Sequence, residues 1–280
     1  MTKWSALFLA AGLFSGSAWG GAIDAIPTCY DNKMVGAPTG VLDTELFVAI
    51  DQTTLLDGGL KQSVADNLKP FLAPGNGFQV VTFSAYTQGH YTEVLASGKL
   101  DAPMEANRRN DVSKTALAKF DQCMGRQPQL AAQIAGGALR AAFDGTSGEI
   151  AKSDVLASLK AIADLSRKSK ARNKIVLLVS DMLENSSVSS FYADRGHSVR
   201  KIAPAKEMQL VEQNQLLGDF GGARVYVIGA GLLSEDGKKS KSYRDPKTMQ
   251  ALATFWKTYL EKSGAQLVEF GQPALLSPIR

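Results

Sequence analysis

Short apolar runs of strand length alternate along this chain with segments whose apolar residues recur at helical spacing. The run at residues 45–50 (ELFVAI) is apolar almost throughout, and so is the run at 174–181 (KIVLLVSD) up to its last two residues. Such strands are buried on both faces, as in parallel sheets covered by helices. Further strands are expected at 78–86, 91–98, 223–231 and 265–271.

The segments between these strands carry helical periodicity. Apolar residues recur at helical spacing in residues 60–72, and a longer helical pattern runs through 104–143, where Gly125 and Pro128 predict a break. Ser153 is predicted as the N-cap of the next helix. The remaining helices are expected near 204–217 and 246–262.

Alternating strands and helices predict an α/β fold, a doubly wound and mostly parallel sheet with helices on both faces. The short polar link between 78–86 and 91–98 suits a β-hairpin, which places one antiparallel strand at an edge. Residues 21–43, rich in proline and glycine, are expected to form an irregular arm. We therefore predict a single domain over 44–280 that follows this arm.

Residues 1–20 have the features of a secretory signal peptide, with cleavage after Gly20. Lys3 precedes an apolar stretch, and small residues occupy positions 18 and 20. The stretch is shorter than the roughly 20 residues that span a bilayer. We expect an exported protein, periplasmic or secreted, with no stable membrane anchor after cleavage.

Charge and composition indicate an ordinary globular protein. The chain is 45% hydrophobic and 21% charged, with a formal net charge of +4. The basic clusters at 167–172 and 238–241 have no interleaved aromatic residues, so we interpret them as solvated surface and expect no nucleic-acid partner.

The chain has two cysteines, Cys29 and Cys123. In an exported protein an even number of cysteines favours a disulfide, which would fix the arm to the domain. Two separate buried thiols are the alternative.

Acidic and hydroxyl side chains follow the most apolar strands. Asp51 comes directly after residues 45–50, Thr53 lies two residues later, and Asp181 ends the run at 174–181. Ligands of doubly wound sheets bind beyond the carboxyl ends of the strands, and Ser153 opens a helix on that side. Two carboxylates and two hydroxyls suit Mg²⁺. The alternative is local: aspartate often begins a turn and serine often caps a helix.

The order of these residues resembles the von Willebrand factor type A family. The family's first motif, Asp-x-Ser/Thr-x-Ser, corresponds to residues 51–55 (DQTTL), and SDVLASL places Ser153 where the family has a helix-opening Thr or Ser. VLLVSDMLENS supplies Asp181 for the aspartate after the fourth strand. The resemblance covers most of the chain from about 44 to 271.

This resemblance implies a metal-ion-dependent adhesion site at Asp51, Thr53, Ser153 and Asp181, for Mg²⁺ or for Mn²⁺ or Ca²⁺ in its place. It also implies a protein partner whose acidic side chain completes the metal shell. The domain would act free or within an envelope, secretion or conjugation assembly. Leu55 departs from the pattern because it cannot coordinate a metal. The site would then bind the ion weakly, hold an additional water, or have lost the ion.

The polar loop at 182–196 follows Asp181 and contains Phe191 and Tyr192. These aromatic residues are either exposed anchors for a partner or fold back onto the domain. Glu184 is expected to be a solvated loop residue, with a position near the site as the alternative.

We expect no enzyme. The alternative is a metal-dependent phosphoesterase that resembles haloacid-dehalogenase-type hydrolases and uses Asp51 as nucleophile. That chemistry needs a second acid two residues later, where this chain has Thr53. The chain also lacks a Gly-x-Ser-x-Gly elbow, and its two histidines, His90 and His197, lack zinc-site spacing.

Overall fold

The computed structural model describes most of the chain from residue 21 to residue 280. The predicted signal peptide lies outside the described residues, as do the link between the hairpin strands and both histidines. Within 21–280, the structure leaves out Asn32, Met34, Thr39 and the segments 85–91, 148–152, 195–197 and 234–244.

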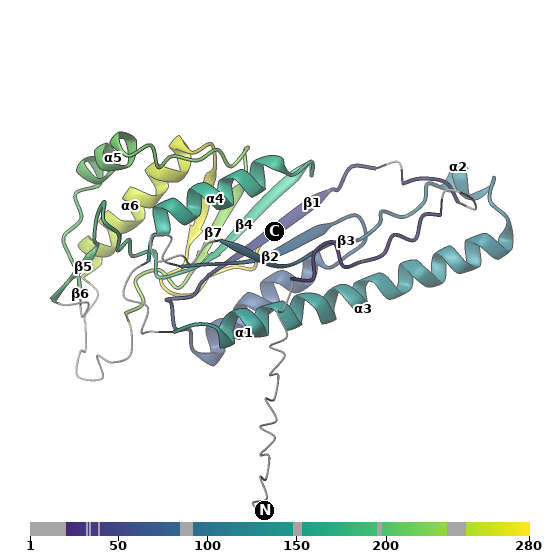
Figure 1. The fold of residues 1–280 in the computed structure, drawn as a ribbon, viewed down its shortest axis with the longest axis horizontal. Coiled ribbons are helices and arrows are strands. Elements are labelled where there is room, and N and C mark those ends of the chain that lie inside the picture. The colour runs from purple at the N-terminus through teal and green to yellow at the C-terminus, as the bar shows by residue number, and fades with distance from the viewer. Residues whose placement is uncertain are drawn as a thin grey trace, which may run out of the picture.

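A six-stranded sheet forms the centre of the fold, in the order β3-β2-β1-β4-β7-β8 (Figure 1). Neighbouring strands are parallel except β2 and β3, which form the antiparallel pair at one edge. This arrangement confirms the predicted fold class. The strands are β1 (Thr44–Asp51), β2 (Gly77–Phe83), β3 (Glu93–Lys99), β4 (Asn173–Val179), β7 (Arg224–Ile228) and β8 (Gln266–Phe270).

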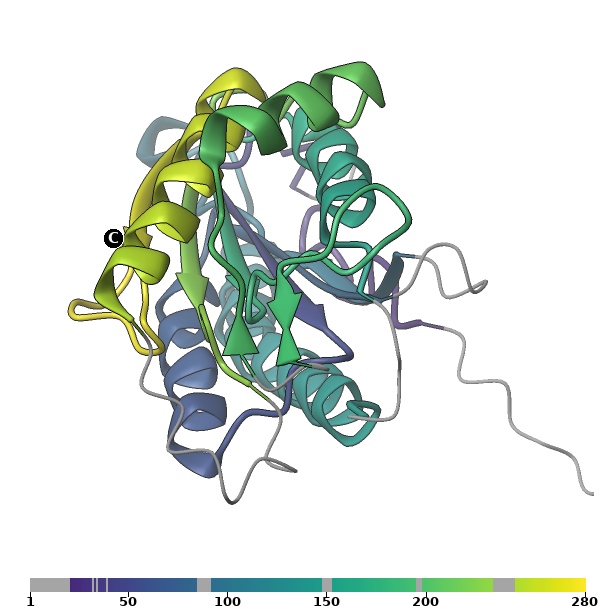
Figure 2. The same cartoon turned by 90° about the vertical axis from the view of Figure 1, so that its left-hand side faces the viewer.

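Helices cover both faces of the sheet (Figure 2). Helices α1 and α3 lie on one face, and α4, α5 and α6 lie on the other. In the described ranges, no helix is both long and apolar enough to cross a membrane. The helices are α1 (Gly58–Leu68, continued by a 3₁₀ turn at Lys69–Phe71), α2 (Ala106–Arg109), α3 (Lys114–Asp144), α4 (Val155–Lys168), α5 (Pro204–Gln213) and α6 (Pro246–Lys262).

Strand β1 shows why an unbroken apolar run forms the middle of this sheet. Its side chains alternate between the two faces, so Leu46 and Val48 pack with α1 and α3, while Phe47 and Ala49 pack with α4 and α6. All four are fully buried. Fully burying a large apolar side chain contributes about 1.5–3 kcal/mol. The apolar clusters on both faces of the sheet therefore pack against β1. This packing fixes the position of Asp51 at the end of the strand.

Helix α3 runs for 31 residues without interruption, so the predicted break near Gly125 and Pro128 is wrong. A proline removes one backbone hydrogen bond from a helix but does not end it when other contacts hold the flanking turns. Gln127 supplies such contacts, because its side chain accepts a hydrogen bond from Asp101 N at 2.9 Å and donates one to the Pro27 carbonyl at 2.8 Å.

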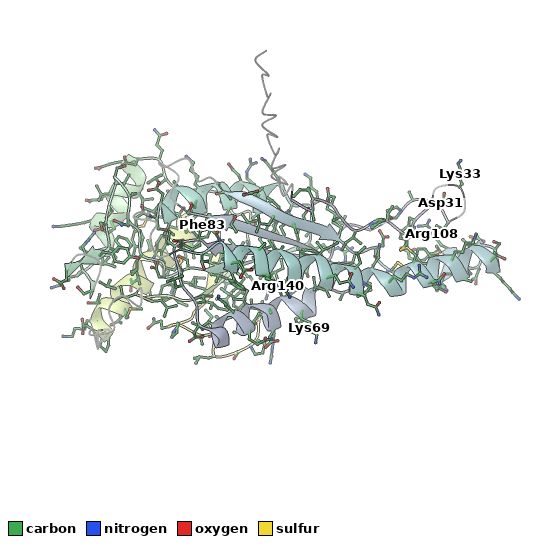
Figure 3. All side chains as sticks on the ribbon, turned by 60° about the horizontal axis from the view of Figure 1, so that its bottom comes forward. Asp31, Lys33, Lys69, Phe83, Arg108 and Arg140 are labelled. Atoms are coloured by element: carbon green, nitrogen blue, oxygen red, sulfur yellow. A yellow bond between two sulfur atoms is a disulfide. The ribbon has the colours of Figure 1, made fainter. Side chains whose placement is uncertain are left out.

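The first half of α3 projects beyond the sheet together with α2 and part of the arm (Figure 1). A disulfide between Cys29 and Cys123 joins the arm to the helix here, which confirms the predicted pairing. Tyr30 packs edge-to-face on Phe120 at 5.0 Å between ring centroids. Figure 3 shows Arg108 in this projecting part, far from Phe83 in the body. The projection thus has a small apolar cluster of its own.

The beginning of the arm lies along the free edge of β3. Ala22 N donates to Leu95 O at 2.9 Å, and Ser97 N donates to Ala22 O at 3.0 Å. An uncovered strand edge exposes unpaired backbone groups to other chains. The arm therefore satisfies part of this edge, and its first residues are hydrogen-bonded to the sheet.

Candidate metal site at the carboxyl edge of the sheet

Strands β1 and β4 bring the two predicted aspartates to one place. The strands are parallel neighbours, with Ile50 paired to Val179. Asp51 therefore lies next to Ser180, and Asp181 follows. Figure 2 looks toward this edge of the sheet, with the small hairpin of β5 (Tyr192–Ala193) and β6 (Ser198–Val199) in front.

Asp51 is the centre of the cluster and is fully buried. Its Oδ1 accepts hydrogen bonds from the Thr53 backbone N at 2.9 Å and the Thr53 hydroxyl at 2.6 Å. Its Oδ2 accepts from the Ser180 hydroxyl at 2.8 Å and the Ser153 hydroxyl at 3.2 Å. Three of the four residues predicted from the sequence are thus in direct contact. Ser180 is a further member that the sequence analysis missed.

Ser153 lies just before α4, and its predicted role as N-cap is wrong by one position. The helix begins at Val155 and Asp154 is the capping position. The Ser153 hydroxyl is free of the helix and points to Asp51 because a backbone bridge to Asn185 fixes the segment, with Asn185 N donating to Ser153 O at 2.9 Å. The residue predicted to hold a metal is therefore directed at the other candidate ligands.

The sequence analysis expected Glu184 to be a solvated loop residue, and this expectation is wrong. The residue is buried, with only 1% of its surface exposed. Its carboxylate accepts the Leu156 N–H at 2.8 Å, so it satisfies a backbone donor in the first turn of α4. Burial raises the pKa of Glu184 to about 7. The helix lacks a side-chain cap at Asp154, and Glu184 supplies the missing acceptor from the loop after β4.

Asp181 is held by four donor and acceptor contacts at the same edge. Its backbone N donates to the Thr54 hydroxyl at 3.0 Å, which ties the β4 loop to the β1 loop. Its Oδ1 accepts from Leu183 N at 2.8 Å, and its Oδ2 accepts from the Tyr192 hydroxyl at 2.7 Å. The backbone carbonyl accepts from Gly231 N at 2.8 Å. The orientation of the carboxylate is thus fixed by Leu183 and Tyr192.

The aromatic residues of the loop after Asp181 fold back onto the domain. Phe191 is fully buried against Phe255, at 5.2 Å between ring centroids. Tyr192 covers Asp181 rather than extending to solvent. Leu55, in contrast, is 43% exposed at the rim. Of the two sequence alternatives for Phe191 and Tyr192, the folded-back arrangement is the observed one.

The cluster places the carboxyl groups of Asp51 and Asp181 in the buried interior. Burial raises the pKa of Asp51, and hydrogen bonds from Thr53 partly oppose this. Burial, followed by the charge of Asp51, raises the pKa of Asp181 to about 8. Among the described residues, no ion pair reaches either aspartate. Buried carboxylates without a counter-charge are costly, and a divalent cation would remove that cost.

The donor set fits a hard cation of the Mg²⁺ type. Mg²⁺ accepts one or two carboxylates and retains several waters, so two aspartates and two hydroxyls are sufficient. The described residues contain no group of three or more His, Cys, Asp or Glu side chains that could hold a metal. A site here therefore depends on the hydroxyls of Thr53 and Ser153 as much as on the acids.

Asp181 gives a prediction for the pH dependence of stability. Its pKa is about 8 in the folded protein against 3.8 as the ordinary value, so the folded state binds the proton more tightly. This contribution to the free energy of unfolding is complete below about pH 4 and is lost as the pH rises toward 8. We expect the melting temperature in EDTA to fall over this range less steeply in Asp181→Asn than in the wild type. Equal slopes for the two proteins would contradict the prediction.

No protein-family model and no curated protein matches the chain. Among solved structures, it is similar to "The crystal structure of an aerotolerance-related membrane protein from Bacteroides fragilis NCTC 9343 with multiple mutations to serines". The identity is 9%, the TM-score is 0.32, and the match covers 81% of this chain and 90% of that chain. With identity and TM-score this low, the fold class stands on the strand order and the placement of the helices.

Proposed function

We propose that the chain is a von Willebrand type A-like binding domain that engages a protein partner through a Mg²⁺-type ion at the carboxyl edge of its sheet. The observation that carries the proposal is the convergence of Thr53, Ser153 and Ser180 on the buried carboxylate of Asp51. Ser153 and Ser180 are separated from Asp51 by 102 and 129 positions in the sequence, yet both hydroxyls donate to its carboxylate. Local turn or capping roles would not require this convergence.

The four residues would hold the ion in two ways. The hydroxyls of Thr53 and Ser153 would contact it directly, and Asp51 and Asp181 would hold it directly or through water. The bound ion supplies a positive charge that attracts an anionic oxygen. Where the aspartates act through water and only the neutral hydroxyls contact the ion, more of its positive charge remains at the open position, and a partner carboxylate can complete the shell.

The disulfide also supports an exported location, because disulfides persist in oxidising compartments. We infer that the mature domain acts in the periplasm or outside the cell. There, Mg²⁺ and Ca²⁺ are both able to occupy an oxygen-lined site. Leu55 removes one hydroxyl from the family pattern, so we place the affinity for the ion below that of a site with all three hydroxyls.

The partner interaction is tested by capture from an envelope extract. Immobilised wild-type protein is incubated with extract in Mg²⁺ or in EDTA, beside a Ser153→Ala variant that lacks one hydroxyl. We expect a specific protein to be retained by the wild type in Mg²⁺, and lost both in EDTA and with Ser153→Ala. Retention that is equal in all three conditions would show that binding does not use this site.

A further inference from the structure

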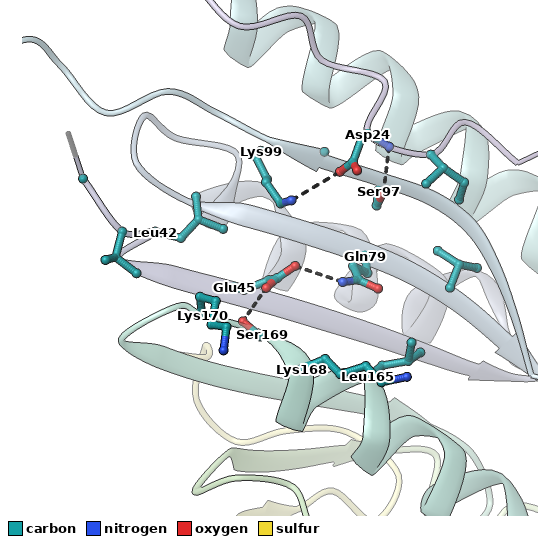
Figure 4. Close-up of a pocket in the computed structure, with 15 residues that line it drawn as sticks. Asp24, Leu42, Glu45, Gln79, Ser97, Lys99, Leu165, Lys168, Ser169 and Lys170 are labelled. Carbon is teal, nitrogen blue, oxygen red and sulfur yellow. Dashed lines mark hydrogen bonds and ion pairs between the residues drawn. The ribbon is translucent and has the colours of Figure 1, made fainter. Parts of the chain in front are cut away.

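A groove of about 820 Å³ opens on the sheet at the end opposite the candidate metal site (Figure 4). Its floor is formed by side chains of β1, β2 and β3. One side carries the ion pair of Lys99 with Asp24, at 3.6 Å, and the other side is the end of α4 and the residues that follow it. The volume lies within the range of ordinary ligand sites.

The floor of the groove is polar where the same sheet face is otherwise core. Glu45 precedes Phe47 by two positions on β1, so both lie on one face, and Phe47 is in the core. Glu45 is also buried, at 4% exposed, although it is charged. Its carboxylate accepts hydrogen bonds from Gln79 Nε2, at 3.0 Å, and from the Ser169 hydroxyl. Ser97 on β3 continues this polar row.

This floor has unused hydrogen-bonding capacity. A carboxylate offers about four acceptor positions, and the bonds from Gln79 and Ser169 use two of those on Glu45. The remaining acceptor positions of Glu45 can accept N–H donors from a ligand on the floor of the groove. The floor therefore favours a ligand that presents N–H donors.

The walls of the groove add two further requirements. Apolar side chains line them, among which Val41 is 53% exposed. Lys168 and Lys170 stand at the α4 side, and neither forms an ion pair with an acid among the described residues. A matching ligand combines N–H donors, an apolar part and a negative charge.

We propose that the groove binds an extended, acidic peptide segment of a partner protein. Its main-chain amides would face Glu45 and Gln79, and its apolar side chains would rest on Val41. A carboxylate of the segment would pair with Lys168 and Lys170. A lipid chain matches the basic rim and the apolar walls but offers no hydrogen-bond donor to the polar floor, so the peptide fits the groove better.

The test selects ligands from a random-peptide display library on the purified protein. The most enriched peptide is synthesised with a fluorescent label and its affinity is measured by anisotropy. We expect enriched peptides to carry acidic and apolar residues together. The double variant Lys168→Glu/Lys170→Glu should weaken binding about tenfold or more, because it places like charges opposite the acidic group. Val41→Asp should weaken binding as well.

Two controls make the result specific to the groove. Lys114→Glu/Lys119→Glu makes the same charge change on exposed positions of α3 and should leave the affinity unchanged. EDTA and Asp51→Asn should also have no effect, which separates this groove from the candidate metal site. The proposal is overturned if no selected peptide depends on Lys168 and Lys170. It is equally overturned if these lysines instead govern binding to phosphatidylglycerol vesicles.

Discussion

Asp51→Asn is expected to abolish the stabilisation of this protein by Mg²⁺ or Mn²⁺. The substitution keeps the shape of the side chain and removes the charge at the centre of the cluster. At a metal concentration of about 100 times the dissociation constant, the wild type should gain about 3 kcal/mol of unfolding free energy, and the variant should gain none. Thermal melting with and without metal measures the difference, and calorimetry gives the affinity.

The metal-free comparison separates a binding effect from a folding effect. In EDTA, Asp51→Asn should be at least as stable as the wild type, because it removes the repulsion between Asp51 and Asp181. Asp66→Asn, an exposed aspartate on α1, is the matched control and should respond to metal like the wild type. An unchanged metal response in Asp51→Asn would remove the basis for an ion at this edge.

Trp256→Ala is expected to lower the free energy of unfolding by about 3–5 kcal/mol. Trp256 is fully buried on α6 and lies 4.9 Å from Phe255 and 5.4 Å from Tyr259 between ring centroids. Its Nε1 donates to the Met182 carbonyl at 2.8 Å. The substitution therefore removes core packing and a support of the loop after Asp181. Denaturant unfolding measures the loss.

Trp256→Phe divides this effect into its two parts. It keeps most of the aromatic packing but leaves the buried Met182 carbonyl without its donor, which should cost about 1–3 kcal/mol. Met182 has a positive φ of 59° and is next to Asp181, so the loosened loop should also weaken metal binding. Lys257→Ala, on the exposed side of the same helix, should change neither quantity. A Trp256→Phe protein as stable as the wild type would show that the hydrogen bond is unimportant.

The centre of the sheet was predictable from the sequence because β1 and β4 are nearly continuous apolar runs, which are typical of strands buried on both faces. Helix α6 was predicted with the bounds that it has, Pro246–Lys262. The helix expected at 204–217 ends earlier, at Gln213, and the two-residue strands β5 and β6 were not anticipated. Elements this short carry no periodicity, so their pairing depends on contacts made elsewhere in the fold.

The candidate site was predictable in part, for a physical reason. Asp51, Thr53, Ser153 and Asp181 follow strands or precede a helix, positions that sequence patterns locate well. Ser180 was missed. Glu184 was expected in solvent, with a position near the site only as the alternative, and the contact of Tyr192 with Asp181 was not anticipated, because these roles depend on loop geometry. A signal for Ser180 was present: parallel pairing of the two most apolar strands places the residue before Asp181 beside Asp51.

The length of α3 links two distant parts of the molecule. At about 1.5 Å per residue, its 31 residues extend over roughly 46 Å. The outer third of the helix is held by the Cys29–Cys123 bond, and near the inner end the Ala142 carbonyl accepts a hydrogen bond from Gln52 Nε2 at 2.9 Å. Gln52 is the neighbour of Asp51. One continuous helix therefore connects the disulfide-bonded projection to the loop that follows Asp51.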